Sequence, residues 1–172
     1  RWIIERAIRD HSLRIDVERI KLKSSYLYNT LININNVKSL SQLRGIEGEA
    51  ASVYFSVFNE LILQQKEDFH FDKRIKRPPM DRVNALLSFT YTLLAGMCKS
   101  ALETVGLDPY VGFLHTDRAG RISLALDLME ELRSIMADRF VLTLINKKLV
   151  KPSGFYTKEN GAVIMDDETK KA

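Results

Sequence analysis

Glu47 is an ionisable residue in a stretch of predicted helix that contains two glycines, which are unfavourable in a helix. Residues 43–51 read LRGIEGEAA, with one glycine on each side of Glu47. Two glycines within a helix cost about 1 kcal/mol each relative to alanine. The usual compensation is the close approach of another backbone or of a ligand. We therefore expect this stretch to lie against a partner group.

Helical spacing gives Glu47 an apolar face. The residues at i+4, i+7, i+8 and i+11 from Glu47 are Ala51, Tyr54, Phe55 and Phe58. A carboxylate on such a face must be paired, protonated or metal-bound, because burying it alone is costly. A salt bridge with Arg44, three residues earlier, is the simpler interpretation on spacing alone. Glu49 falls on a different, mixed face.

A second group of candidate ligands follows in the chain. His115 and Asp117 precede Asp127 and Glu130, and the last two are three residues apart on one helical face. Carboxylates with one imidazole suit Mn²⁺ or Mg²⁺, which favour hard oxygen ligands. A solvated acidic helix face explains the same residues, and spacing alone favours it.

Basic residues gather between these two groups. Four of the five residues from 73 to 77 are positively charged, namely Lys73, Arg74, Lys76 and Arg77. Such a loop can contact phosphates in a salt-sensitive, sequence-independent way, or it can simply be solvated. Phe69 and Phe71 can stack on bases or anchor the loop to the core.

Long helices must position these side chains. The apolar period predicts a mainly α fold in one domain over residues 1–172, with a short C-terminal β-hairpin turning at Asn160-Gly161. Ser39 or Ser41 is the expected cap of the third helix, Pro78-Pro79 the first turn of the fourth, and Gly106 its left-handed end. The expected helices cover about residues 2–10, 14–33, 39–65, 80–105 and 121–149.

Composition narrows the classes of protein to which this chain can belong. The chain has 172 residues, 26 Lys and Arg against 22 Asp and Glu, and a net charge of +4, which mildly favours a polyanionic partner. Its one cysteine fits a reducing compartment, and no segment comes near the roughly 20 apolar residues of a membrane helix. There is no phosphate-binding glycine loop, zinc-binding Cys cluster or nucleophile-elbow spacing. Metal-assisted chemistry is therefore the more economical enzyme hypothesis.

Four strings of this sequence together resemble the CRISPR-associated integrase that installs new spacers, the first-numbered Cas protein. The resemblance extends over essentially the whole chain and is closest to the type I, subtype C branch. The strings are LRGIEGEAA at 43–51, DRVNALLS at 81–88, GFLH at 112–115 and SLALDLME at 123–130.

The resemblance implies a fold and a site. The family has an N-terminal β-domain and a helical catalytic domain, so a chain with only the helices and without an initiator Met is expected to be a fragment. It implies Glu47, His115 and Glu130 as ligands of Mn²⁺ or Mg²⁺, with Asp127 as a supporting catalytic residue. Glu49 matches no ligand position. Plausible phosphate contacts are Arg44, Lys73, Arg74, Lys76 and Arg77.

The resemblance also implies an activity and partners. A metal-dependent endonuclease and integrase of the prokaryotic cytoplasm joins the 3′-hydroxyl of spacer-precursor DNA to the CRISPR repeat by transesterification. The full-length protein is expected to form homodimers flanking a smaller Cas subunit, without a membrane, and the fragment alone is expected to integrate poorly. Two other interpretations are a metal-free helical DNA-binding module and a purely structural helical domain. Neither requires Glu47, His115 and Glu130 to converge.

Overall fold

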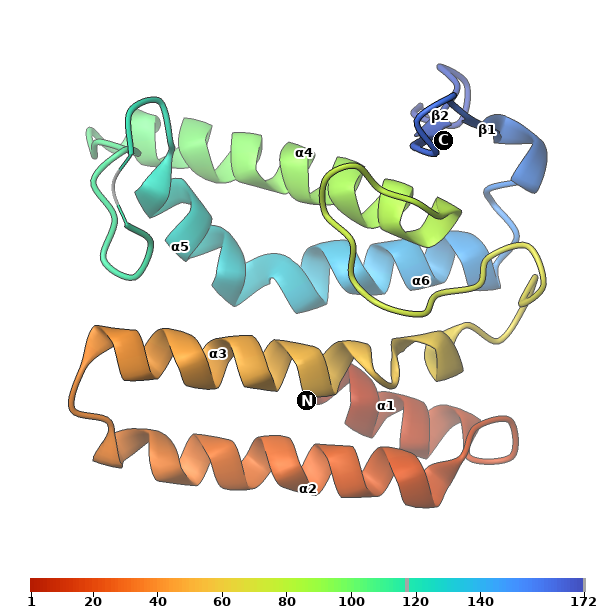
Figure 1. The fold of residues 1–172 in the computed structure, drawn as a ribbon, viewed down its shortest axis with the longest axis horizontal. Helices are drawn as coiled ribbons and strands as arrows, with labels where there is room; N and C mark the ends of the chain where they lie inside the picture. Colours follow the sequence, from red (N-terminus) through yellow and green to blue (C-terminus); the bar gives the residue numbers. More distant parts are fainter. Residues whose placement is uncertain (117, 172) are drawn as a thin grey trace.

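The computed structural model describes residues 1–116 and 118–171, so Asp117 lies outside the described residues. The chain is mainly helical and ends in one small antiparallel sheet (Figure 1). The longer helices are α1 (Trp2–His11), α2 (Val17–Asn33), α3 (Leu40–Phe55), α4 (Arg82–Thr104), α5 (Ser123–Leu132) and α6 (Arg139–Asn146). The short segments are η1 (Ile34–Asn36), η2 (Phe58–Leu61), the π-helical η3 (Arg133–Asp138), η4 (Pro152–Gly154), β1 (Phe155–Thr157) and β2 (Val163–Met165).

Side-chain caps fix where three helices begin. The side chains of Asp16, Ser39 and Asp81 each accept a hydrogen bond from the backbone N–H three residues later. These bonds satisfy donors that the first helical turn leaves unpaired. The prediction of Ser39 as a cap is confirmed.

The prediction that Pro78 and Pro79 form the first turn of α4 is wrong. The helix begins at Arg82, after the Asp81 cap. The carbonyl of Pro79 instead accepts a hydrogen bond from the N–H of Val163, so the two prolines lie against the hairpin.

Two predicted helices are interrupted. The helix expected to reach residue 65 ends at Phe55, where the chain turns so that Phe55 and Phe58 both pack on Phe71. The helix expected over 121–149 is divided by the π-helical segment η3 and ends at Asn146. A 3.6-residue period cannot reveal either change, because apolar positions continue through both interruptions.

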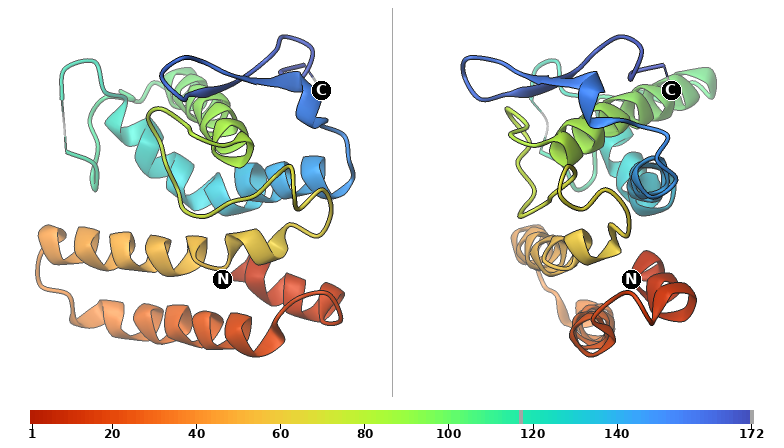
Figure 2. Two further views of the ribbon diagram at one scale, coloured as in Figure 1. Left: turned by 45° about the vertical axis from the view of Figure 1, so that its right-hand side comes forward. Right: turned by 90° about the vertical axis from the view of Figure 1, so that its right-hand side faces the viewer.

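The helices form two layers. Helices α1, α2 and α3 make one layer, and α4, α5, η3 and α6 make the other (Figures 1 and 2). The main core lies between the layers, and its largest fully buried side chains include Phe58, Ile4, Ile20 and Leu87. A smaller apolar cluster fills the space between α4 and α5 around Leu94, Cys98 and Met129. Cys98 is thus a buried thiol.

The turn predictions at two glycines are confirmed. Gly106 ends α4 with φ of 77°, and Gly161 turns the hairpin with φ of 80°, both in the left-handed region that favours glycine. Strand β1 pairs with β2 so that Phe155 faces Met165 and Thr157 faces Val163. Strand β2 also contacts α4, so the hairpin packs on the layer that contains α4, α5 and α6.

Helix α4 is long and apolar enough, by length and composition, to cross a membrane. The expectation that no segment comes near this limit is therefore wrong. In this fold α4 contacts α5, η3, α6 and β2, and residues such as Val83, Leu87 and Leu94 are buried there.

Candidate functional site

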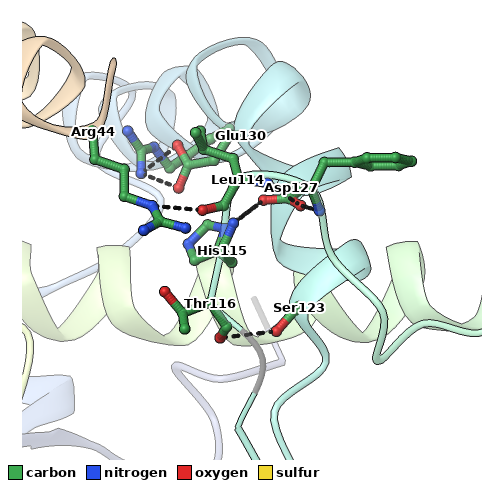
Figure 3. Close-up of polar contacts among 9 residues, drawn as sticks. Arg44, Leu114, His115, Thr116, Ser123, Asp127 and Glu130 are labelled. Atoms are coloured by element: carbon green, nitrogen blue, oxygen red, sulfur yellow. Dashed lines mark hydrogen bonds and ion pairs between the residues drawn. The ribbon is translucent and has the colours of Figure 1, made fainter. Parts of the chain in front are cut away.

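Asp127 organises the loop that carries His115. Its Oδ2 accepts hydrogen bonds from the N–H of Phe113 at 2.6 Å and of Leu114 at 3.0 Å. Its Oδ1 accepts one from the N–H of His115 at 3.0 Å and contacts Nδ1 of the same histidine at 2.6 Å (Figure 3). One side chain of α5 therefore fixes both the backbone and the ring of this loop.

These contacts also fix the chemistry of the pair. Burial alone would raise the pKa of Asp127, but the hydrogen bonds from the His115 ring and from three backbone N–H groups outweigh it and lower the pKa. The ionised carboxylate can only accept, so Nδ1 of His115 carries a proton. In the neutral ring Nε2 then keeps its lone pair, which is the arrangement of a metal-binding histidine oriented by a carboxylate.

Gly112 makes the close packing of this loop possible. An added Cβ at Gly112 would lie 2.6 Å from Cβ of Ser123 and 3.0 Å from Oδ2 of Asp127. Any larger residue would push the loop away from α5. The need for glycine here was not recognised from the sequence, because its φ is not unusual and only tertiary contacts impose it.

Glu47 faces the same site from the other layer. It is half-buried and lines a pocket of about 240 Å³ together with Arg44, Leu114, His115, Thr116 and Arg121. Arg44 donates a 2.8 Å hydrogen bond from Nε to the carbonyl of Leu114 (Figure 3). Within residues 1–116 and 118–171, Arg44 and Glu47 form no ion pair. The simpler interpretation of Glu47 as the partner of Arg44 is therefore wrong.

Glu130 is the third predicted ligand, and it is already paired. Nη1 of Arg133 lies 2.7 Å from Oε1 and 2.6 Å from Oε2 of Glu130, as the two dashed lines on Glu130 in Figure 3 show. Burial raises the pKa of Glu130, and the nearby Glu47 carboxylate raises it further. Arg133, His115 and Lys76 act in the opposite direction. Glu47, His115 and Glu130 thus share one electrostatic neighbourhood.

The three predicted ligands are suitable in kind for a divalent cation, but they are not assembled around one point. Two carboxylates and an imidazole Nε2 are donors that Mn²⁺ accepts. In the part of the chain that the structure describes, no three His, Cys, Asp or Glu side chains are placed to hold a metal ion together.

Glu49 and the two glycines lie on the outer side of α3. Glu49 accepts a hydrogen bond from the Tyr26 hydroxyl, away from the pocket, in agreement with the helical wheel. A Cβ added to Gly45 or Gly48 would find no atom within 4 Å. The expected approach of another protein backbone is therefore wrong for the described residues, and the alternative, the approach of a ligand, stays a prediction.

The basic loop divides into two kinds of residue. Lys73, Lys76 and Arg77 are exposed. The guanidinium of Arg74 instead turns inward, where it donates to Oδ1 of Asn84 at 2.7 Å and to Oγ of Ser88 at 3.1 Å. It also lies 5.2 Å from the ring centroid of Tyr91. This arrangement speaks against Arg74 as a phosphate contact, because its donors hold the loop to α4.

Asn84 anchors the loop from α4 and was not identified as functional from the sequence. It is fully buried, accepts from the N–H of Ile75 and donates to the carbonyl of Lys73. Phe69 and Phe71 are also buried, so of the two interpretations of these rings the anchor is correct and base stacking is wrong. The signal for Asn84 was its polar side chain in an otherwise apolar run.

Known proteins are similar to this chain in sequence and in fold. Residues 1–172 match the family model described as CRISPR associated protein Cas1. A relative from Chlorobaculum tepidum, named CRISPR-associated endonuclease Cas1 1, is 48% identical over 171 residues, which cover 99% of this chain and 50% of the relative. The chain thus spans about half the length of that relative.

Two solved structures have the same helical arrangement. A casposase bound to integration product superposes with a TM-score of 0.79 at 29% identity, covering 98% of this chain and 44% of the casposase chain. A chain of a Cas6-RT-Cas1–Cas2 complex gives a TM-score of 0.85 at 26% identity, covering 98% of this chain and 18% of that chain. The mainly helical fold predicted from the sequence is confirmed, and this chain belongs to the Cas1 family of CRISPR-associated proteins.

Proposed function

We propose that this chain is the catalytic part of a divalent-metal-dependent DNA integrase and endonuclease of CRISPR adaptation. The observation that carries the proposal is the Asp127–His115 pair, which leaves Nε2 of an oriented histidine beside the pocket that Glu47 lines. The names of the relatives support the reaction class, since one is called an endonuclease and a solved neighbour is a casposase bound to integration product.

The residues divide the work as follows. His115 and the carboxylates of Glu47 and Glu130 would hold Mn²⁺ or Mg²⁺. Asp127 keeps the imidazole in the required tautomer and orientation. When bound, the cation would polarise the scissile phosphate and stabilise charge on the attacking and leaving oxygens of a transesterification. The 3′-hydroxyl of a spacer-precursor DNA would be the attacking group and the CRISPR repeat the target.

Exposed cations would position the DNA. Lys73, Lys76 and Arg77 can contact phosphates without reading sequence. Arg121, which lines the pocket with Glu47, and Arg44 add positive charge at the site itself. For the longer protein we propose a homodimer with a smaller Cas2-type subunit, working in the prokaryotic cytoplasm. The complex of Cas1 with Cas2 among the structural neighbours supports this partner.

The test is strand transfer with the full-length protein that contains this chain. With Mn²⁺ and a branched DNA substrate, we expect His115→Ala and Glu47→Ala each to lower the rate about 100-fold, since losing even a residue that only orients a metal ligand typically costs 10–100-fold. Glu49→Ala is the matched control, because Glu49 is a glutamate of the same helix whose side chain bonds to Tyr26 and not to the pocket residues.

The outcomes separate the possibilities. Unchanged strand transfer in His115→Ala or Glu47→Ala would refute the site assignment. A loss in Glu49→Ala equal to that in Glu47→Ala would mean that the wrong glutamate was chosen. DNA binding without any metal-dependent cleavage or transfer would favour the metal-free DNA-binding module.

A further inference from the structure

Arg133 lies between the candidate site and a buried polar cluster. On one side its Nη1 is within 2.7 Å of both oxygens of Glu130. On the other side its guanidinium carbon lies 5.6 Å from the ring centroid of Tyr91. Only about a fifth of each side chain of the Arg133–Glu130 pair is exposed, 19% and 22%. Water therefore screens this ion pair poorly.

The buried cluster consists of Tyr54, Tyr91 and Asp138, and we call it the Asp138 cluster. Asp138 is 1% exposed and accepts hydrogen bonds from the hydroxyls of Tyr54, at 2.9 Å, and Tyr91. Burial raises the pKa of Asp138, whereas the two tyrosines and the charges of Arg133 and Arg74 lower it. Burial has the larger effect, so the pKa of Asp138 lies above its ordinary value, and the charge of Arg133 acts on this carboxyl group as well as on Glu130.

The backbone explains why Arg133 and Asp138 are close. They are the first and last residues of η3, the π-helical segment. A π-helix bonds residues five apart, so these two side chains begin and end a single turn. In a continuous α-helix they would point to clearly different sides of the axis. Arg133 therefore pairs with Glu130 on one side, while Tyr91 contacts both Arg133 and Asp138 on the other.

The proposed function requires the same oxygens of Glu130 that Arg133 now holds. We propose that Arg133 is a positioning residue that competes with the divalent cation for Glu130 and moves toward the Asp138 cluster when the carboxylate is released. The inference rests on the proposed metal site. It assigns to Arg133 and Asp138, which are not themselves ligands, a role in controlling whether Glu130 is free to bind the cation. In this structure the contact with Arg133 occupies both oxygens of Glu130, one of the three proposed ligands.

Calorimetric Mn²⁺ binding to the full-length protein tests this proposal. Arg133→Gln removes the competing charge, so we expect Mn²⁺ to bind about tenfold more tightly, the size of a lost charge-assisted hydrogen bond. Arg133→Lys keeps a cation and should stay close to the parent. Damage to the fold would weaken binding, so a gain in affinity cannot arise from misfolding.

Asp138→Asn tests the second position of Arg133. Without that carboxylate Arg133 should stay on Glu130, and Mn²⁺ binding should weaken. In the Arg133→Gln background the same substitution should leave the affinity unchanged, which is the expected result for two residues acting through each other.

The results distinguish the two proposals. If the parent binds Mn²⁺ but Arg133→Gln binds it equally or less tightly, the role of Arg133 is overturned and the metal site stands. Equal losses from Asp138→Asn in both backgrounds would likewise overturn the role of Arg133, because the substitution would then act through stability alone. If the parent binds no Mn²⁺, and Glu47→Ala changes nothing, the metal site itself fails together with the inference.

Discussion

At the residue scale, Asp127 positions His115 and the loop that carries it. Its two oxygens accept hydrogen bonds from three backbone N–H groups, which hold the loop, and contact Nδ1 of His115. The ring can therefore neither rotate nor exchange its tautomer without breaking a charge-assisted hydrogen bond. The role of Asp127 is thus to hold the ring, which is why it need not itself be a ligand. Gly112 completes the arrangement by allowing the loop to lie directly on Ser123.

Gly112→Ala tests how closely the loop must approach α5. The new methyl would lie 2.6 Å from Cβ of Ser123 and 3.0 Å from its backbone carbon, so the loop must move. We expect a loss of roughly 1–3 kcal/mol in the free energy of unfolding, measured by urea denaturation, together with a large loss of strand transfer. Gly96→Ala in α4 is the control, since its Cβ would meet no atom within 4 Å. A fully active, equally stable Gly112→Ala would show that the loop does not need this contact.

At the scale of elements, two helices and one loop contribute residues to the site from different directions. Helix α3 brings Glu47, helix α5 brings Asp127 and Glu130, and the loop after α4 brings His115. The π-helical segment η3 then turns Asp138 toward Tyr54 of α3 and Tyr91 of α4. Because Tyr54 lies on the same face of α3 as Glu47, the bond from Tyr54 to Asp138 links the helix of one ligand to the π-helical segment that follows the helix of another.

The outer face of α3 gives a prediction about glycine. Gly45 and Gly48 are exposed, and a Cβ at either position would meet nothing. Gly45→Ala and Gly48→Ala should therefore each stabilise the protein by up to about 1 kcal/mol, because alanine is the better helix former. If DNA compensates the cost of these glycines by approaching this face, the same variants should bind DNA more weakly in a fluorescence anisotropy titration. Higher stability with unchanged DNA affinity would contradict that compensation.

At the scale of the whole molecule, the positions of the charged side chains distinguish cations that can bind DNA from a cation that stabilises the fold. The net charge of +4 is small, and the basic loop contributes to it unequally. Lys73, Lys76 and Arg77 face solvent, while Arg74 donates its protons to Asn84 and Ser88 of α4. Burial lowers the pKa of Arg74, as expected for a cation placed inside the protein.

Salt dependence of DNA binding measures this difference. Each of Lys73→Ala, Lys76→Ala and Arg77→Ala should reduce the slope of log K against log salt by about 0.9 for each lost contact with a duplex phosphate. Arg74→Ala should leave the slope unchanged and lower the stability of the loop. A reduced slope in Arg74→Ala with unchanged slopes in the other three variants would reverse our assignment.

The sequence alone determined the local features, because these depend on neighbouring residues. Helical period predicted five helical stretches within a mainly α chain, and the wheel separated Glu47 from Glu49. The cap at Ser39 or Ser41 and the glycines at 106 and 161 follow from local hydrogen bonding and φ. Its resemblance to a known family supplied His115, Asp127 and Glu130, whose spacing by itself favoured a solvated face. None of these inferences required knowing which elements pack together.

The tertiary structure decided everything that depends on contacts between distant residues. It broke two continuous periodic stretches at Phe55 and at η3, turned Arg74 inward onto Asn84, and buried Phe69 and Phe71. It also brought Asp138 of η3 onto the hydroxyls of Tyr54 and Tyr91, which lie on two other helices. Periodicity records which side of a helix is apolar, but the partner of each charged side chain is chosen by the element that packs against it.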